Sequence, residues 1–265
     1  MENYAELVYE HIKVWAEDGI GFIQMNRPKS LNAVSAKGLD ENYEVLVKYN
    51  LDPEIKVVIF CGHENVFCAG ADLVAVKAMT SFEARNFLDK VHRNLFFIEE
   101  LNKPVIAAIQ GLALGGGLEL AMACDLAVAA DNSTFGLPEI NLGIFPGGGG
   151  TQRMLRHSSV KLVKQYIFTG DFFNAQIAQQ MGVVNMVVPS DEVMATAIKL
   201  AKRIAKKSPL ALREAKHAIN VAMNTDLKTG CRAEQLGWSM MFSSEDQKEG
   251  MTAFMESRKA NFTGK

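Results

Sequence analysis

The sequence lacks three features that would each indicate a particular class of protein. Its 28 lysines and arginines do not outnumber its 30 aspartates and glutamates, so the basic excess typical of nucleic-acid-binding chains is missing. No stretch reaches the ~18 to 20 consecutive apolar residues that a membrane-spanning helix needs. The first residues carry acids where a secretion signal has a basic run and an apolar core. We therefore expect a cytoplasmic protein that binds neither nucleic acid nor membrane.

Cysteine is scarce, and its spacing argues against a metal centre. The four cysteines form no CxxC pair, and no group of histidines and cysteines has the spacing of zinc ligands. We expect small apolar core thiols in a reducing compartment, and no metal site. The cysteines are Cys61, Cys68, Cys124 and Cys231.

Several well-known catalytic and phosphate-binding motifs are also missing. There is no GxSxG, and the five histidines lie outside the glycine-rich segments, so hydrolysis by a Ser-His-Asp triad has no support. The glycines of residues 111–125 are not followed by the Lys-Ser or Lys-Thr of a phosphate loop, and they do not fit the dinucleotide fingerprint GxGxxG. The chemistry must therefore come from other residues.

The sequence has the composition of a globular protein, with 48% apolar and 22% charged residues. In the first half, apolar runs alternate with helical spacing, which predicts an α/β fold. Asp18-Gly19 is a hairpin signal between two of the strands. We expect strands over 7–15, 20–25, 56–61, 104–109 and 126–130, and helices over about 36–50, 82–101 and 116–124.

The second half is almost entirely helical in its spacing. Apart from a strand over 183–188, we expect helices over 159–168, 174–181, 191–206, 210–223, 230–242 and 245–257. A helical tail of this kind often covers a site or builds a subunit interface. We therefore expect a core over residues 1–200 that holds the active site, and a helical C-terminal region over 201–265 for oligomerisation and active-site cover.

Residues 67–73, with the sequence FCAGADL, form the first of three segments with more small residues than a scaffold needs. They follow the strand 56–61 and precede a helical stretch, so a ligand could approach their backbone closely. Backbone N–H groups at the start of a helix donate to anionic oxygens. The alternative is a tight turn in which Asp72 caps the helix.

Residues 111–125 place three glycines directly before a very apolar helix, so free N–H groups and the positive end of the helix dipole meet at one point. Glu119 lies in the first turn of that helix, between Leu118 and Leu120. Burial of a lone carboxylate is costly, so its presence there indicates a function. The alternative is that Glu119 faces water and stabilises the helix dipole.

Residues 135–153 hold Glu139, directly after Pro138, and a run of four glycines. Pro138 restricts the local backbone, and four glycines cost chain entropy, which indicates crowding against a ligand or another segment. The alternative is a flexible surface loop, which apolar neighbours disfavour. These neighbours are Phe135, Ile140, Leu142, Ile144 and Phe145.

The three segments together offer two backbone donor sites and two carboxylates. Such groups can stabilise an enolate-like oxyanion and move protons at the neighbouring carbons. In this order and spacing, the segments resemble those of the crotonase, or enoyl-CoA hydratase/isomerase, superfamily. The resemblance extends to NRPKSLNA at 26–33 and RKANF at 258–262, and so covers nearly the whole chain. It implies an α/β fold with a crotonase-like core of repeated β-β-α units and a helical C-terminal region.

The resemblance implies roles for four residues. The N–H groups of Ala71 and Gly116 would form an oxyanion hole for the thioester oxygen of an acyl-CoA. Glu119 would orient and deprotonate a water molecule, and Glu139 would deliver a proton to C2. Family members that hydrate a double bond resemble this sequence in having both glutamates. We therefore expect a lyase of fatty acid metabolism, an enoyl-CoA hydratase that converts a trans-2-enoyl-CoA reversibly to a 3-hydroxyacyl-CoA.

Other functions on the same scaffold remain as alternatives. They are a hydratase of a cyclic or dienoyl-CoA, an enoyl-CoA isomerase, and a non-catalytic binder of CoA ligands. The resemblance implies no cofactor, because coenzyme A is part of the substrate. It also implies a set of substrate contacts, in which the Gly147 backbone helps to place the water. These contacts are Lys29, Leu31, Ala69, Ala71, Asp72, Leu73, Gly116, Gly147 and Lys259.

Two positions depart from the common pattern of the family. Val74 stands where a lysine near the CoA nucleotide is frequent, with Lys77 three residues further on. Leu118 replaces a smaller residue, and we expect it to alter the acyl pocket. The resemblance further implies a homotrimer or homohexamer. Lys259 in the tail would then approach a CoA phosphate and compensate for the lysine missing at Val74.

Overall fold

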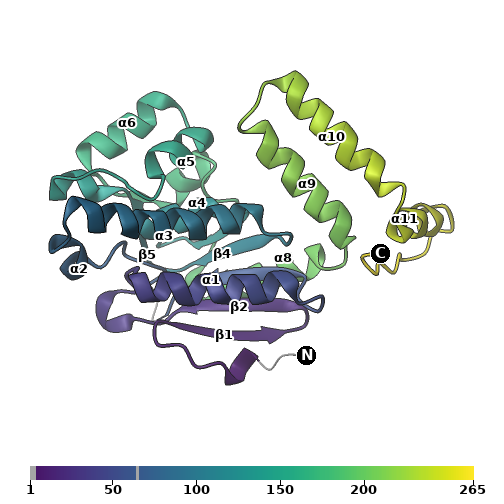
Figure 1. Ribbon diagram of the computed structural model, residues 1–265, viewed down its shortest axis with the longest axis horizontal. Coiled ribbons are helices and arrows are strands. Elements are labelled where there is room, and N and C mark those ends of the chain that lie inside the picture. Colours follow the sequence, from purple (N-terminus) through teal and green to yellow (C-terminus); the bar gives the residue numbers. More distant parts are fainter. Residues whose placement is uncertain (1–3, 64–65) are drawn as a thin grey trace.

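A mixed sheet with helices on both faces forms the body of the protein, and the last three helices project from it as an arm (Figure 1). This computed structural model describes residues 4–63 and 66–265. It confirms the α/β class. The strands are β1 (Ile12–Glu17), β2 (Ile20–Met25), β3 (Val57–Cys61), β4 (Val105–Ile109), β5 (Leu112–Leu114), β6 (Leu126–Ala130), β7 (Thr134–Gly136), β8 (Phe173–Asn174) and β9 (Met186–Val188).

The helices agree well with the sequence predictions, apart from α5, which begins at the last residue of the glycine run and was not expected. They are α1 (Ala36–Leu51), α2 (Leu73–Lys77), α3 (Ser81–Glu100), α4 (Gly116–Ala123), α5 (Gly150–His157), α6 (Val160–Thr169), α7 (Ala175–Gln180), α8 (Val193–Ile204), α9 (Pro209–Ala222), α10 (Leu227–Met241) and α11 (Glu245–Met255).

The strands β1 and β2 form the expected hairpin, in which Ile12 pairs with Met25. Asp18 and Gly19 at its turn both have positive φ angles, of 50° and 77°, which is typical of a type I′ turn. The first strand begins at Ile12, although the sequence predicted a start at Leu7. The reason is a side chain: the carboxylate of Glu41 accepts the backbone N–H groups that precede Ile12, at 3.1 and 2.9 Å.

The main sheet has the order β1-β2-β3-β4-β6-β9, and every pair after the hairpin is parallel. Every residue of β3 and β4 is buried. Side chains alternate between the two faces of a strand, so Phe60 packs under α1 and α3 while Ile59 packs against α8. Burial on both faces explains why these strands appear in the sequence as continuous apolar runs.

A second, three-stranded sheet brings the three glycine-rich segments together. Its order is β5-β7-β8, and Leu114 at the end of β5 pairs in parallel with Gly136 at the end of β7. Cys68 in the first segment forms a parallel bridge with Ala113 of β5. Because parallel strands end at the same edge of a sheet, the residues that follow Cys68, Leu114 and Gly136 meet there. The sequence did not predict β5, β7 or β8, which are only two or three residues long.

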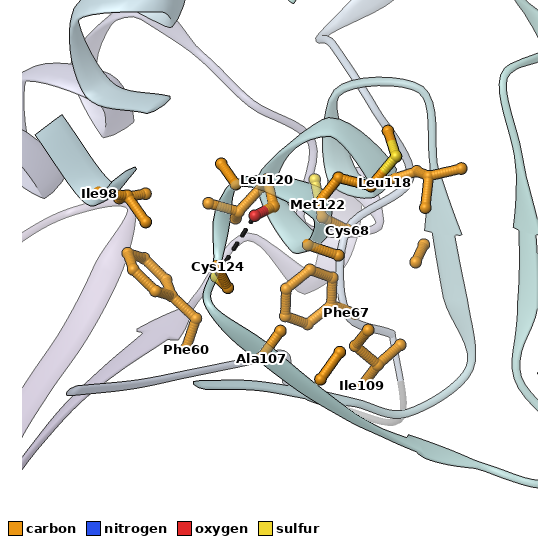
Figure 2. Packing of buried hydrophobic residues seen from close by; sticks show 14 of the residues in the cluster. Phe60, Phe67, Cys68, Ile98, Ala107, Ile109, Leu118, Leu120, Met122 and Cys124 are labelled. Carbon is orange, nitrogen blue, oxygen red and sulfur yellow. Dashed lines mark hydrogen bonds between the residues drawn. The ribbon is translucent and has the colours of Figure 1, made fainter. Parts of the chain in front are cut away.

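The helix α4 is anchored in the core that lies on the α1 and α3 side of the main sheet. Figure 2 shows this packing around Leu118, Leu120 and Met122, with Phe67 below them. Three of the four cysteines are buried, as expected, but Cys231 on α10 is exposed, so that prediction is wrong for this residue.

The arm consists of α9, α10 and α11. The helices α9 and α10 pack against each other and extend away from the body, as Figure 1 shows. Lys216 on α9 ties the arm to the body: its ammonium group donates to the carbonyl oxygens of Ile98 and Lys103 and to the Asp125 carboxylate, at 2.8 to 3.2 Å. The helix α8 packs on the sheet and runs across the expected boundary between residues 200 and 201, so the arm begins beyond it.

Candidate active site

A pocket of about 510 Å³ lies where the three glycine-rich segments meet, and α1, α3 and α4 form much of its wall. Its lining is largely apolar, with Phe87, Leu88 and Val91 of α3 facing the glycine-rich segments. Exposed apolar side chains from the third segment stand around it, namely Leu142, Ile144 and Phe145. The sequence-predicted residues that line the pocket are Ala69, Ala71, Leu73, Gly116, Glu119, Glu139 and Gly147.

Glu119 is the most deeply buried carboxyl group of the pocket. It lies in the first turn of α4 and is only 3% exposed, so the alternative that it faces water is wrong. Its Oε1 accepts the backbone N–H of Gly150 at 2.7 Å. Burial raises the pKa of Glu119 to about 7, and the nearby Glu139 carboxyl adds to this, while backbone N–H groups and Arg153 act in the opposite direction.

The glycine run gives Glu119 its close contact with the backbone. A Cβ atom at Gly148 would lie 2.2 Å from Oε2 of Glu119, and one at Gly150 would lie 3.0 Å from Oε1. Real atoms do not approach to 2.2 Å, so no side chain fits at Gly148 unless the carboxylate moves. The glycines at 148 to 150 are buried, and Gly150 begins α5. The alternative of a flexible surface loop is therefore wrong.

Glu139 lies in a 3₁₀ helix, η3 (Pro138–Leu142), that follows β7. Its Oε1 is 3.0 Å from where a Cβ of Gly115 would stand, directly before α4. Its Oε2 is buried, and no residue that the structure describes offers it a hydrogen bond. Burial raises the pKa of Glu139. Two carboxyl groups with raised pKa values therefore share one pocket, and such a pair favours retention of a proton on one of them.

The backbone N–H groups of Ala71 and Gly116 lie side by side at the same edge. A Cβ at Gly116 would stand 3.8 Å from the nitrogen of Ala71. The backbone of Val34 pairs with residues 70–72: its N–H donates to the carbonyl oxygen of Gly70, and its carbonyl oxygen accepts the N–H of Asp72. The N–H of Ala71, between these two, therefore points away from Val34. Within residues 4–63 and 66–265, no hydrogen bond uses either N–H group. Two backbone donors therefore lie close together at this edge, and neither is used within the described part of the chain.

Four sequence-predicted residues do not line the pocket. Asp72 caps α2 and pairs with Arg27 at 2.8 Å, so the alternative of an Asp cap is correct for this residue. Leu31 lies at the rim, where its carbonyl oxygen accepts the N–H of Ala69 at 3.0 Å. Lys29 is exposed, and Lys259 is exposed beyond α11 in the arm.

Two of the remaining expectations concern α2 and α4. Val74 is 86% exposed on α2, and Lys77 ends the same helix. Leu118 is fully buried among the core residues (Figure 2). It is not one of the residues that line the pocket. The prediction that Leu118 alters the acyl pocket is therefore wrong. Its side chain leaves α4 on the side of Met122 and Cys68, whereas Glu119 leaves it on the side of the pocket.

Sequence reasoning missed Arg153 as a residue of the site. Arg153 lies on α5, is only 7% exposed, and donates to the carbonyl oxygen of Gly148 at 2.7 Å. The available signal was a basic side chain three residues after the glycine run. Among the residues described, no group of three or more metal-binding side chains is placed to hold a metal ion. The described helices include none that is both long and apolar enough to cross a membrane.

The sequence matches the family described as enoyl-CoA hydratase/isomerase over residues 16–265, and the chain belongs to this family. Among its relatives, a crotonyl-CoA hydratase from Syntrophomonas wolfei is 42% identical over 98% of this chain and 100% of its own length. A short-chain-enoyl-CoA hydratase from Clostridium acetobutylicum is 44% identical over 92% of this chain and 94% of its own. The crystal structure of an enoyl-CoA hydratase from Bacillus anthracis superposes with a TM-score of 0.93, at 38% identity, over 97% of this chain and 100% of that chain.

Proposed function

We propose that this chain is an enoyl-CoA hydratase that works with two carboxyl groups and two backbone N–H donors. It adds water reversibly across the 2,3 double bond of a trans-2-enoyl-CoA and yields a 3-hydroxyacyl-CoA. The observation that carries the proposal is the placement of Glu119 and Glu139 in one largely apolar pocket, beside the unused N–H groups of Ala71 and Gly116. The names of the relatives, at 42 and 44% identity, support the same reaction.

The N–H pair supplies the electrophilic part of the mechanism. Water is a poor nucleophile, and C3 of the enoyl group accepts it only when negative charge can move to the thioester oxygen. The N–H groups of Ala71 and Gly116 donate to that oxygen and stabilise the charge as it develops. Loss of one such donor typically costs about 3 to 4 kcal/mol of transition-state stabilisation.

The two carboxyl groups divide the proton transfers. As the family resemblance implies, Glu119 acts as the base that takes a proton from water, and the backbone N–H of Gly150, at 2.7 Å, stabilises its charged form against the effect of burial. Glu139 holds the proton that passes to C2, and its buried Oε2 has no hydrogen-bond partner among the described residues. The hydroxyl oxygen of the water bonds to C3, and the electrons of the double bond form the new C–H bond at C2. The product therefore carries one added water and no net change in charge.

The body and the arm share the binding of coenzyme A in this proposal. Lys29, Leu31 and Asp72 contact the CoA moiety, and the backbones of Leu31 and Asp72 are hydrogen-bonded to the pocket-lining residues Ala69 and Val34. Lys259 approaches a CoA phosphate from the arm, in the same or the adjacent subunit. The protein forms a homotrimer or homohexamer through an arm that exposes large apolar side chains. These are Ile219, Met223, Leu227, Leu236, Trp238, Met240, Phe242, Met251, Phe254 and Met255.

A cytoplasmic location completes the proposal. The cysteines Cys61, Cys68, Cys124 and Cys231 are all free thiols, which fits a reducing compartment.

An isomerase is the second candidate, since the family name includes this activity. Both reactions use the oxyanion hole, but hydration needs a base for water in addition to an acid, and the presence of both Glu119 and Glu139 favours hydration. The test is steady-state turnover with C4 to C16 trans-2-enoyl-CoAs and one alicyclic enoyl-CoA, followed by the loss of ultraviolet absorbance of the enoyl thioester. We expect turnover of crotonyl-CoA. If a 3-enoyl-CoA is converted and every 2-enoyl-CoA is left unhydrated, the isomerase is correct.

A further inference from the structure

Arg153 lies directly behind the glycine run that contacts Glu119. Its side chain is 8% exposed and is fixed by two hydrogen bonds, from Nη1 to the carbonyl oxygen of Gly148 at 2.7 Å and from Nε to Oε1 of Glu99 at 2.6 Å. The guanidinium group also lies over the ring of Phe96, 5.5 Å from its centre. A buried arginine held from three sides has a defined position, unlike a solvated surface charge.

The backbone between Arg153 and Glu119 is closely packed against both side chains. A Cβ at Gly149 would lie 2.2 Å from Nη1 of Arg153, and Gly149 has a φ angle of +96°, which favours glycine. The residues on either side of Gly149 contact the Glu119 carboxylate, Gly150 through its N–H at 2.7 Å. A hydrogen bond from Arg153 to Gly148 therefore fixes the peptide groups against which Glu119 rests.

We propose that Arg153, aligned by Glu99, is a positioning residue for the hydration reaction: it holds the 148–150 backbone against Glu119 and supplies a buried positive charge behind the carboxylate. This inference rests on the proposed function, since it assigns a role in the same site. Arg153 lines no part of the pocket and acts through the backbone and through its charge.

The charged groups around Glu119 give the direction of the effect. The carboxyl group of Glu139 raises the pKa of Glu119, and the cation of Arg153 lowers it. Two further titratable groups are near Arg153. Glu99 binds its Nε, and a ring carbon of His92 lies 4.0 Å from where a Cβ of Gly149 would stand. Loss of the Arg153 cation therefore raises the pKa of Glu119. Because the base must be ionised to act, the acidic limb of the rate profile moves to higher pH.

The test compares Arg153→Met and Arg153→Lys with a matched control, Arg156→Met. Arg156 lies on the same helix, is exposed, and donates to Gln152 O and Asn224 Oδ1 away from the pocket. For Arg153→Met with crotonyl-CoA we expect kcat to fall on the order of 10 to 100-fold, KM to change less than about threefold, and the acidic limb to move to higher pH. In Arg153→Lys the acidic limb should lie close to its wild-type pH, because lysine keeps the positive charge. Its kcat should recover less, because lysine lacks the planar guanidinium group that reaches both Gly148 and Glu99. Arg156→Met should match the wild type.

Two results would overturn the proposal. One is a folded Arg153→Met with wild-type kcat and pH profile, and the other is a fall in kcat with an unmoved acidic limb, which is the mark of a merely structural role. If Arg153→Met does not fold, Arg153→Gln, which also removes the charge, carries the same comparison against Arg153→Lys.

A measurement without substrate separates this inference from the function it rests on. The pKa of Glu119 can be followed by carbon-13 NMR of labelled glutamate side chains, with Glu119→Gln to assign the signal. A higher pKa in Arg153→Met supports the positioning role even if no enoyl-CoA is hydrated, whereas an unchanged pKa refutes it even if hydration is observed.

Discussion

Replacement of Glu119 by glutamine tests whether its carboxyl group is held in an unfavourable environment for the sake of function. Burial raises the pKa of Glu119 from its usual value near 4.5 to about 7. Below the lower value both the folded and the unfolded chains are protonated at this position, so burial has no ionisation cost. Between the two values only the unfolded chain ionises, so the folded state loses stability as pH rises. Above about 7 the loss is complete and constant.

The size of this loss follows from the two pKa values. A tenfold change in proton affinity corresponds to about 1.4 kcal/mol, so the difference between 4.5 and about 7 amounts to about 3 kcal/mol. Glutamine does not ionise, so the Glu119→Gln variant should gain about 3 kcal/mol of unfolding free energy relative to wild type between pH 4.5 and 8. Its amide places an N–H₂ group where Oε2 faces Gly148, which adds a cost that does not vary with pH. The quantity to measure is therefore how the difference in unfolding free energy between the variant and the wild type changes with pH.

Urea unfolding at pH 5, 6, 7 and 8, at one protein concentration, gives this slope. Glu234→Gln, which changes an exposed glutamate on α10, is the control and should show no such gain. The Glu119→Gln variant should also lose turnover by a factor on the order of 10² or more. A stability difference that is constant from pH 5 to 8 would refute the raised pKa, and wild-type turnover in the variant would refute the two-carboxyl mechanism.

Four further predictions test the rest of the site. Glu139→Gln removes the acid but keeps the size of the side chain, so turnover should fall on the order of 10²-fold or more while an unreactive acyl-CoA still binds, as calorimetry can show. In a crystal structure with an acyl-CoA, the thioester oxygen should lie within about 3.2 Å of both Ala71 N and Gly116 N. A thioester oxygen bound elsewhere would contradict the assignment of these two N–H groups as the oxyanion hole. Gly148→Ala should lower kcat at least about 10²-fold, because its Cβ would lie 2.2 Å from a carboxylate oxygen of the base; unchanged kinetics would contradict the close contact. Lys259→Ala should raise KM more than it lowers kcat, and light scattering should report about 87 or 175 kDa, three or six chains of 29.1 kDa; an unaltered KM or a monomer would contradict the respective role of the arm.

The sequence predicted those elements whose pattern depends on their own neighbours. The continuous apolar run of β4, the hairpin turn at Asp18 and Gly19, and the helix α3 were all confirmed, since burial and backbone conformation follow there from local spacing. The motifs around Ala71, Gly116, Glu119 and Glu139 could be found because glycine and lone carboxylates are unusual in apolar surroundings. Their convergence on one pocket could not be derived from local spacing, because it depends on three strands of two or three residues each.

Features that depend on contacts between distant segments could not be predicted. The direction of Leu118 is set by how α4 rotates against the core, and one residue of rotation separates a pocket wall from a buried core side chain. The helix α5 starts in a glycine run, which by propensity alone ends helices. The role of Arg153 depends on Glu99, 54 residues earlier in the chain.

The construction of the proposed oxyanion hole has a consequence for how this scaffold tolerates mutation. Its proposed donors are main-chain N–H groups of Ala71 and Gly116, which persist through every side-chain substitution except proline. The electrophilic half of the site is thus robust to most point mutations that leave the backbone in place. The proton-transfer half consists of two side chains, each replaceable by a single codon change. New activities can therefore arise on this chain by substitution of the two glutamates, while the backbone donors still activate the thioester.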